Sequence, residues 1–163
     1  MDLKIYKIKP KYIKYLSSFA KHLFHNMQLN QKYERKYIGI VLRVNGFNYF
    51  VPLSSFKEKH KSMKENVDFI KIKDYAVINI NNMFPVPEGN YTYVDISKEK
   101  DPHYRALLQA EYRVIKAKQK RIMRNAAIIY MHKIKKGNTT PLAKRCNDFA
   151  TLEQACVLYE KGQ

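Results

Sequence analysis

The sequence predicts a compact α+β domain in which a small, mostly antiparallel sheet is surrounded by basic helices. Two apolar runs joined by Asn45-Gly46 predict a β-hairpin. From Asp101 onward the apolar residues change to a seven-residue spacing, which indicates a long helix. The chain has 163 residues, of which 45% are hydrophobic, so we expect residues 1–163 to form a single domain with its own core.

The N-terminal region predicts a strand and then a helix. Residues 3–8 alternate apolar and basic side chains, as a half-buried strand does. Pro10 suits the first turn of a helix, and an apolar face follows it at three- and four-residue spacing: Tyr12, Ile13, Leu16, Phe19, Ala20 and Leu23. Residues 25–36 are polar and lack periodicity, so they predict a long loop of the kind that is often functional.

The hairpin is the clearest local signal in the chain. Both residues of Asn45-Gly46 tolerate positive φ, which predicts a type I′ turn. Regular alternation would place Ile38 and Ile40 on the same face of the first strand. Pro52 cannot donate to a strand ladder, so it predicts an edge or the end of the second strand.

Short elements are predicted between the hairpin and the C-terminal helices. Residues 57–66 are highly charged and predict a loop or a short helix. Strands are expected at 69–72 and 76–80, and another at 91–96. Two prolines make residues 83–87 an irregular extended segment.

The C-terminal third predicts helices. Asp101 is the expected N-cap and Pro102 the first helical residue. The stripe that follows predicts one long helix, or two with a break, ending near Gly137: Leu108, Ile115, Ile122 and Ile129. A last helix is expected over 151–159, with Thr151 as its cap.

The net charge of +17 points to a polyanionic partner. Lys and Arg number 31 against 14 Asp and Glu, and residues 112–147 contain eleven bases and no acid. Nucleic acid is the usual partner of such a chain, and a solvated basic surface without a dedicated ligand is the alternative. No apolar run is long enough to cross a bilayer, and the N-terminus lacks an apolar signal segment, so a cytoplasmic protein is expected. Cys146 and Cys156 are then expected as free thiols.

Phosphate chemistry is expected where the hairpin ends. The second strand runs into Ser54-Ser55 and then a basic cluster of Lys57, Lys59 and His60. RNA carries its own nucleophile, since the 2′-hydroxyl can attack the adjacent phosphorus and leave a 2′,3′-cyclic phosphate. Hydroxyls and ammoniums can orient and neutralise that phosphate, and an imidazole can move a proton. The competing interpretation is a strand-terminating turn followed by a solvated lysine-rich loop.

No cofactor is expected from the pattern of possible ligands. The chain has no glycine-rich phosphate loop. The five histidines form no metal-binding motif: His22, His25, His60, His103 and His132.

Five segments, in order, resemble the toxins of type III toxin–antitoxin systems, the ToxN/AbiQ/CptN endoribonuclease family. They are IYKIKPKYIKYL, YIGIVLRVNGFNYFVPLSSFKEKH, INNMFPVP, DPHYRALLQAEYRVIK and CNDFATLEQACVLYE. Together they cover nearly the whole chain.

The resemblance implies a fold, an activity and partners. The fold is a strongly twisted antiparallel sheet with added helices, similar to the core of other ribonuclease toxins. The activity is metal-independent cleavage of cellular mRNA, with growth arrest and phage defence as its outcome. The toxin also cuts a repetitive precursor into small antitoxin RNAs, each a pseudoknot that inhibits it. Toxin and RNA then form a closed 2:2 or 3:3 assembly.

The resemblance also suggests roles for individual residues. Ser54, Ser55 and Lys57 match the family's hydroxyl-hydroxyl-x-Lys segment and are the expected catalytic residues. Tyr12 matches a family tyrosine. The expected RNA-binding residues are Tyr12, Tyr33, Arg35, Lys36, Lys59, His60, Arg113, Lys116, Lys120 and Arg124, of which the last three are expected to contact the antitoxin backbone.

Two other functions fit the charge. A non-enzymatic RNA-binding or ribosome-associated protein needs only the basic surface and the thirteen tyrosines. A DNA-binding regulator could use the long basic helix, but no helix-turn-helix spacing is present.

Overall fold

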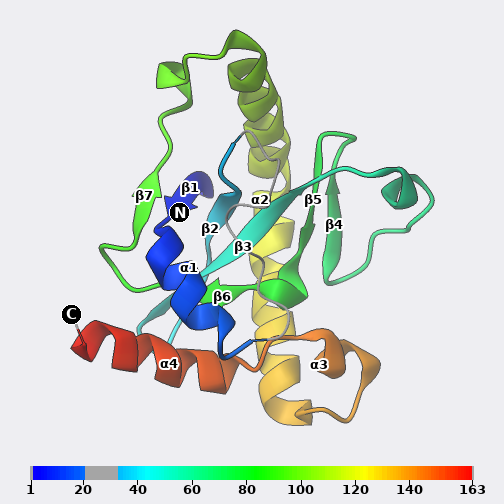
Figure 1. Ribbon diagram of the computed structural model, residues 1–163. Helices are drawn as coiled ribbons and strands as arrows, with labels where there is room; N and C mark the ends of the chain where they lie inside the picture. The colour runs from blue at the N-terminus through cyan, green and yellow to red at the C-terminus, as the bar shows by residue number, and fades with distance from the viewer. Residues whose placement is uncertain (1, 21–32, 163) are drawn as a thin grey trace.

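A seven-stranded sheet lies between one long helix and two shorter helices (Figure 1). The computed structural model describes residues 2–20 and 33–162. The strands are β1 (Lys4–Ile8), β2 (Lys36–Val44), β3 (Phe47–Ser55), β4 (Phe69–Ile72), β5 (Ala76–Asn79), β6 (Phe84–Pro85) and β7 (Tyr91–Tyr93). Their order is β4-β5-β3-β2-β1-β7, with β6 also paired to β3, and every pair is antiparallel. The predicted α+β class with an antiparallel sheet is confirmed.

The helices are α1 (Pro10–Ser17), α2 (Pro102–Lys136), α3 (Pro141–Arg145) and α4 (Phe149–Lys161). The long helix α2 is unbroken, and the Asp101 side chain caps it by accepting from the amides of His103 and Tyr104. The helix α1 ends at Ser17, so the expected continuation of its apolar face is wrong at Phe19, which lies beyond the helix and is 40% exposed. Leu23 and most of the predicted loop at 25–36 lie outside the described residues.

Two details of the C-terminal helices differ from the expectation. The side chain of Asp148, and not that of Thr151, caps α4 and accepts from the Thr151 amide. This earlier start lets the fully buried Phe149 pack in the core from the first helical position. The short helix α3 was not expected, because five residues are too few to show a helical period.

The two faces of the sheet pack against different helices. Side chains of one face, such as Ile38 and Val51, form a core with the buried stripe of α2. Side chains of the other face, such as Tyr37 and Phe50, pack against α1 and α4. The long helix therefore covers one face, and the N- and C-terminal helices share the other (Figure 1).

A bulge in β2 changes the predicted faces of the hairpin. The register with β3 shifts between Gly39 and Leu42, so Ile38 and Ile40 lie in different cores and the expected shared face is wrong. Gly39 permits this packing, since a Cβ at this position would overlap the ring of Phe50. The turn itself is as predicted, with φ of 52° at Asn45 and 81° at Gly46.

Pro52 does not end its strand, contrary to the expectation. It pairs with Tyr37 of β2 on one side of β3. On the other side, β6 pairs at Tyr49 and Phe50, and β5 begins its pairing at Leu53. Pro52 thus lies between the β6 and β5 pairings on this side of β3, where its missing backbone N–H breaks no strand hydrogen bond.

No helix in the described part of the chain is long and apolar enough to span a bilayer.

Candidate active site

The end of β3 extends past the beginning of β2. Lys36, the first residue of β2, lies opposite Leu53, so Ser54 and Ser55 pair only with β5 among the described strands. Alternation along β3 places Ser55 on the α2 side with Leu53, and Ser54 on the opposite side. The hairpin therefore presents one hydroxyl to each face at an open corner of the sheet.

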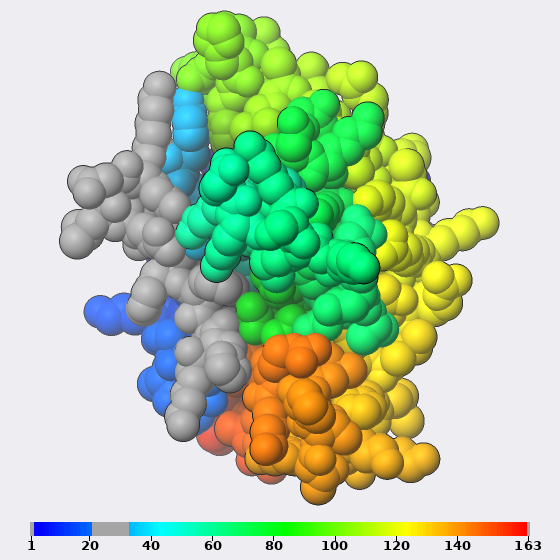
Figure 2. Space-filling model, turned by 90° about the vertical axis from the view of Figure 1, so that its right-hand side faces the viewer, coloured from blue at the N-terminus to red at the C-terminus, as the bar shows by residue number. Residues whose placement is uncertain are grey.

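A pocket of about 440 Å³ occupies this corner. It is lined by residues 33–36 before and at the start of β2, the end of β3, the loop that follows, β5, and the first turns of α2. Eight predicted site residues line it: Tyr33, Arg35, Lys36, Ser54, Ser55, Lys57, Lys59 and His60. In Figure 2 the segment after β3, in blue-green, lies near the lime-green beginning of α2 on this side of the molecule.

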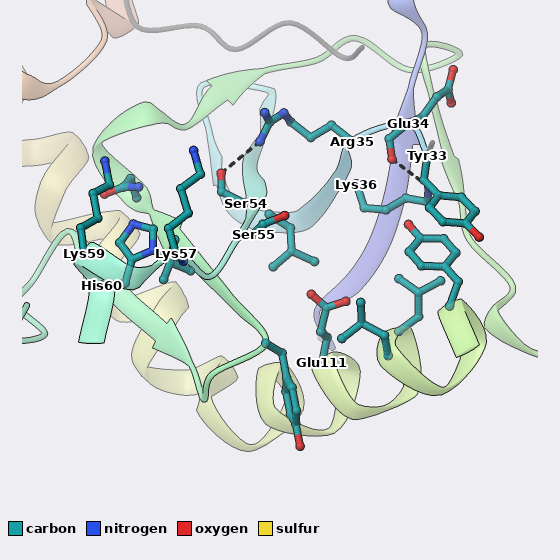
Figure 3. A pocket seen from close by; sticks show the side chains of 17 residues that line it. Tyr33, Glu34, Arg35, Lys36, Ser54, Ser55, Lys57, Lys59, His60 and Glu111 are labelled. Atoms are coloured by element: carbon teal, nitrogen blue, oxygen red, sulfur yellow. Dashed lines mark hydrogen bonds between the residues drawn. The ribbon is translucent and has the colours of Figure 1, made fainter. Parts of the chain in front are cut away.

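Arg35 and Ser54 form the part of the site on the side away from α2. The Arg35 guanidinium donates to the Ser54 hydroxyl over 3.0 Å, as the dashed line in Figure 3 shows. Burial lowers the pKa of Arg35, but a guanidinium stays charged at any physiological pH. The permanently charged guanidinium of Arg35 thus orients the hydroxyl of Ser54, one of the two hydroxyls that we expect to contact a phosphate.

Lys36 belongs to the α2 side of the pocket. Its side chain is buried, its ammonium donates to the carbonyl of Glu34 at 3.0 Å, and it lies 5.3 Å from the ring centre of Tyr104. Burial lowers the pKa of Lys36, and the charge of Lys7 lowers it further.

Tyr33 contributes an aromatic wall. Its ring stacks on Tyr104 with the centroids 3.9 Å apart and the planes 9° apart. Its hydroxyl donates to Asp101, the residue that also caps α2. The tyrosine pair therefore ties the segment before β2 to the beginning of the long helix.

His60 is buried beside the backbone of Lys57 and is not an exposed surface residue. The Lys57 amide donates to Nδ1 of His60 over 2.8 Å, and the ring packs against Phe56 and Phe69. Burial lowers the pKa of His60, and Lys59, Lys57 and Lys71 lower it further. Neutral His60 with its proton on Nε2 is therefore favoured, and its visible contact positions the backbone of Lys57.

Glu111 is a pocket residue that the sequence analysis missed. It belongs to α2, its side chain is 5% exposed, and Figure 3 shows its carboxyl directed into the pocket below Ser55 and Lys36. A signal was available in the sequence, because Glu111 is the only acid between Pro102 and Lys136. It also shares the helix face of the apolar residues Leu108 and Ile115.

Tyr12 is not part of this site, and its predicted RNA contact is corrected. Its side chain has no exposed surface, its hydroxyl donates to the carbonyl of Pro85 at 2.6 Å, and its ring packs edge-on against Tyr159. A ring enclosed in the core between α1 and α4 cannot stack on a nucleotide.

The basic residues predicted on α2 lie apart from the pocket. Their spacing places Arg113, Lys116, Lys120 and Arg124 on one exposed face of the helix. The pocket-lining residues of α2 are Tyr104, Leu107, Leu108 and Glu111, which lie on the opposite face. The predicted RNA contacts thus divide into a pocket group and an outer group.

The chemistry available in the pocket suits a phosphodiester. Cations and hydroxyls surround the end of β3, and a buried acid lies across from them. Among the described residues, no group of three or more histidines, cysteines or acids is placed to hold a metal ion. Cys146 and Cys156 lie elsewhere as buried free thiols, and burial raises the pKa of each to about 11.

Residues 4–157 match the family described as Toxin ToxN, type III toxin–antitoxin system. This chain belongs to the ToxN family. The resemblance drawn from the sequence is confirmed, and the order of the matching segments reflects membership across nearly the whole chain.

Two curated ToxN-family relatives are similar over most of their length. The chain is 29% identical to the endoribonuclease ToxN of Bacillus thuringiensis subsp. kurstaki, covering 97% of this chain and 84% of the relative. It is also 29% identical to the endoribonuclease AbiQ of Lactococcus lactis subsp. lactis, covering 99% and 91%.

Solved structures share the fold. AbiQ, a lactococcal anti-phage endoribonuclease of a type III system, matches with a TM-score of 0.82 and 26% identity over 99% of both chains. A type III toxin studied for its selective inhibition by a non-coding RNA pseudoknot matches with a TM-score of 0.79 and 27% identity, again over 99% of both chains. The sheet and helices described above are therefore the ToxN-family fold.

Proposed function

We propose that this chain is the toxin of a type III toxin–antitoxin system, an endoribonuclease that cleaves cellular RNA and is inhibited by a small non-coding RNA. The observation that carries the proposal is the gathering of Ser54, Ser55 and Lys57 with Arg35 and Lys36 in one pocket of a ToxN-family fold. The names of the relatives support the activity, and the chemistry of the pocket supports the substrate class.

The site works by positioning and neutralising one phosphodiester. Lys57 is exposed at the pocket, where its ammonium can offset the charge that grows on the phosphate oxygens in the transition state. Ser54, held by Arg35, and Ser55 donate to the same phosphate from the two sides of β3. The stacked pair of Tyr33 and Tyr104 offers an aromatic surface for a flanking nucleotide.

Cleavage uses the 2′-hydroxyl of the substrate as nucleophile. Its oxygen attacks phosphorus, the bond to the 5′-oxygen breaks, and the products are a 2′,3′-cyclic phosphate and a 5′-hydroxyl. No water is consumed in this step, and the protein residues named above supply alignment and charge.

The same pocket processes and then accepts the inhibitor. The repetitive precursor RNA is cut into units, and each folded unit remains bound and blocks the pocket. The outer basic face of α2, residues 113–124, holds the backbone of that RNA in a closed assembly of two or three toxins and as many RNAs. Because cellular mRNA is the substrate, the toxin acts in the cytoplasm, where cleavage halts growth and limits phage multiplication.

The decisive experiment is cleavage without divalent metal. The protein, made by cell-free translation, is incubated with a test mRNA in EDTA, and the new 3′ ends are analysed. We expect discrete cuts whose 3′ ends become dephosphorylatable only after the cyclic phosphate is opened. Intact RNA with a verified folded protein would instead favour the non-enzymatic RNA-binding alternative.

A further inference from the structure

Glu111 is a largely buried acid whose carboxyl opens into the pocket. Its side chain is 5% exposed, and no hydrogen bond or ion pair within the described residues involves its carboxyl. Its oxygens are not among the enclosed side-chain atoms that lack a partner, so the carboxyl is open to whatever occupies the pocket. It is also the only acid among the 35 residues of α2. Nothing in the packing explains why this position is not apolar like its neighbours Leu108 and Ile115.

The surroundings leave Glu111 ready to exchange a proton near neutrality. Burial raises the pKa of Glu111 to about 7, and the charge of Lys36 opposes this shift. The other cations that line the pocket are Arg35, Lys57 and Lys59. The remaining titratable groups that line it are Glu34, His60, Tyr33, Tyr75 and Tyr104.

The competing groups are poorly placed to accept a proton. In His60, Nδ1 already accepts from the Lys57 amide, so the neutral ring has its proton on Nε2 and no free acceptor. Tyr104 is protonated at neutral pH, since burial raises its pKa. In Figure 3 Glu34 points away from the hydroxyl pair, whereas Glu111 points toward it.

The geometry supplies a place for the nucleotide between the two groups. Ser55 lies on the α2 side of β3, the side from which Glu111 projects. A phosphate held at Ser54, Ser55 and Lys57 would place its ribose in the pocket space in front of α2. The volume of about 440 Å³ is within the usual range for a small-molecule site.

We propose that Glu111 is the general base that takes the proton from the attacking 2′-hydroxyl. This inference rests on the proposed ribonuclease function. The 2′-oxygen–hydrogen bond breaks as the 2′-oxygen bonds to phosphorus, and the proton moves to the Glu111 carboxylate. The bond from phosphorus to the 5′-oxygen then breaks, and that oxygen takes a proton from the Lys57 ammonium. Exchange with water returns one proton to Lys57 and removes one from Glu111.

The test compares the wild type with E111Q and E111D in single-turnover cleavage from pH 5 to pH 9. For the wild type we expect the rate to rise with pH and to level off above about pH 7, because the base must be deprotonated. E111Q should lose at least about 100-fold in rate, as is usual for removal of a general base, and should lose this inflection. E111D should keep the inflection with a reduced rate. RNA binding by E111Q, measured by anisotropy, should stay within about threefold of wild type.

A thermal readout separates this role from a structural one. The folded protein holds the Glu111 proton more tightly than the unfolded chain, so stability is highest at low pH and is lost as pH rises through about 7. E111Q should therefore melt higher than wild type, and the difference should be larger at pH 8 than at pH 5. A lower melting temperature at pH 8 would assign Glu111 to the framework and overturn the proposal.

The matched control is E153Q, which changes an acid that accepts hydrogen bonds from Tyr49 and Tyr130 on the far side of the hairpin. Its pH–rate profile should match that of the wild type. The proposal fails if E111Q retains wild-type rates, if its inflection persists, or if it changes only the sequence that is cut. If the wild type itself does not cleave RNA, the proposed ribonuclease function fails. The wild-type measurement therefore distinguishes that failure from a failure of the role proposed for Glu111.

Discussion

The two ends of the β2–β3 hairpin each have an acid nearby, but the two acids differ in their surroundings. Near the Asn45–Gly46 turn, Glu153 accepts hydrogen bonds from the hydroxyls of Tyr49 at 2.6 Å and Tyr130 at 2.8 Å. Asn45 donates to the same Tyr130 hydroxyl over 3.3 Å. At the opposite end, Glu111 lies in the pocket with no such partner in the described residues.

The difference indicates that the turn end of the hairpin has a structural role, whereas the open end carries the candidate site. At the turn, burial and the bond to Glu153 raise the pKa of Tyr130 to about 12, so the Tyr130 hydroxyl keeps its proton at physiological pH and can donate to Glu153. At the open end, hydroxyl, cationic and carboxyl groups line the pocket where the strand extends past its neighbour. Polar groups directed into an open pocket are expected where a protein keeps them for function.

The largest effect should come from Lys57→Ala at the open end. Loss of its charge should lower the cleavage rate by about 10²–10³-fold, because the growing charge on the phosphate loses its counterion. Single-turnover kinetics and growth arrest on expression without antitoxin both measure this. The matched control is Lys64→Ala, an exposed lysine of the same loop that does not line the pocket. Equal loss in both variants would mean that general charge, and not this site, matters.

Glu153→Ala should disturb the turn end and leave the chemistry intact. The hydroxyls of Tyr49 and Tyr130 would lose their acceptor, at a cost of about 2 kcal/mol in the free energy of unfolding. Urea denaturation measures this, and cleavage per folded molecule should be unchanged. Loss of cleavage without loss of stability would contradict the separation of the two ends.

His60→Ala should have a smaller effect, acting through Lys57. Without an acceptor for the Lys57 amide, the ammonium is less well placed, and we expect about a tenfold lower rate. His60→Asn offers a side-chain oxygen to the same amide and should recover part of the rate. The pH inflection should remain in both variants, whereas its disappearance would make His60 the titrating group instead.

The smallest effect on cleavage is expected from reversing the charges at Lys116, Lys120 and Arg124. These residues lie on the outer face of α2, so cleavage of a short oligonucleotide should change less than about threefold. Binding of a long RNA should weaken, and its dependence on salt should become shallower by about two to three in slope. An unchanged slope would remove this face from the RNA interface.

Local signals predicted much of the fold. The Asn45–Gly46 turn, the Asp101 cap of α2 and the antiparallel sheet all follow from residues near one another in the chain. The cap of α4 at Asp148 was missed, because Thr151 is also a good capping residue and only the burial of Phe149 distinguishes them. The β2 bulge was missed because it depends on the fit of Gly39 against Phe50 across the pair.

The candidate site was predicted only in part, because only some of its residues are close together in the chain. Ser54, Ser55 and Lys57 are consecutive or nearly so, and one strand end is enough to bring them together. Tyr12 has the same side chain as Tyr33, and only packing shows that one ring is enclosed by α1 and α4 while the other lines the pocket. Glu111 lies 54 positions after Lys57 in the chain.

The sequence by itself determined the family, the class of fold, the positive charge and the hydroxyl–lysine segment. Composition, turn chemistry and helical spacing depend on residues close together in the chain, so they can be assessed without knowledge of long-range contacts. The tertiary structure alone decided which residues line the pocket: it enclosed Tyr12, turned the basic face of α2 away from the pocket, and brought Glu111 opposite Ser55. Burial and the loss of water around a carboxyl depend on what packs beside it, and no spacing in the chain specifies that.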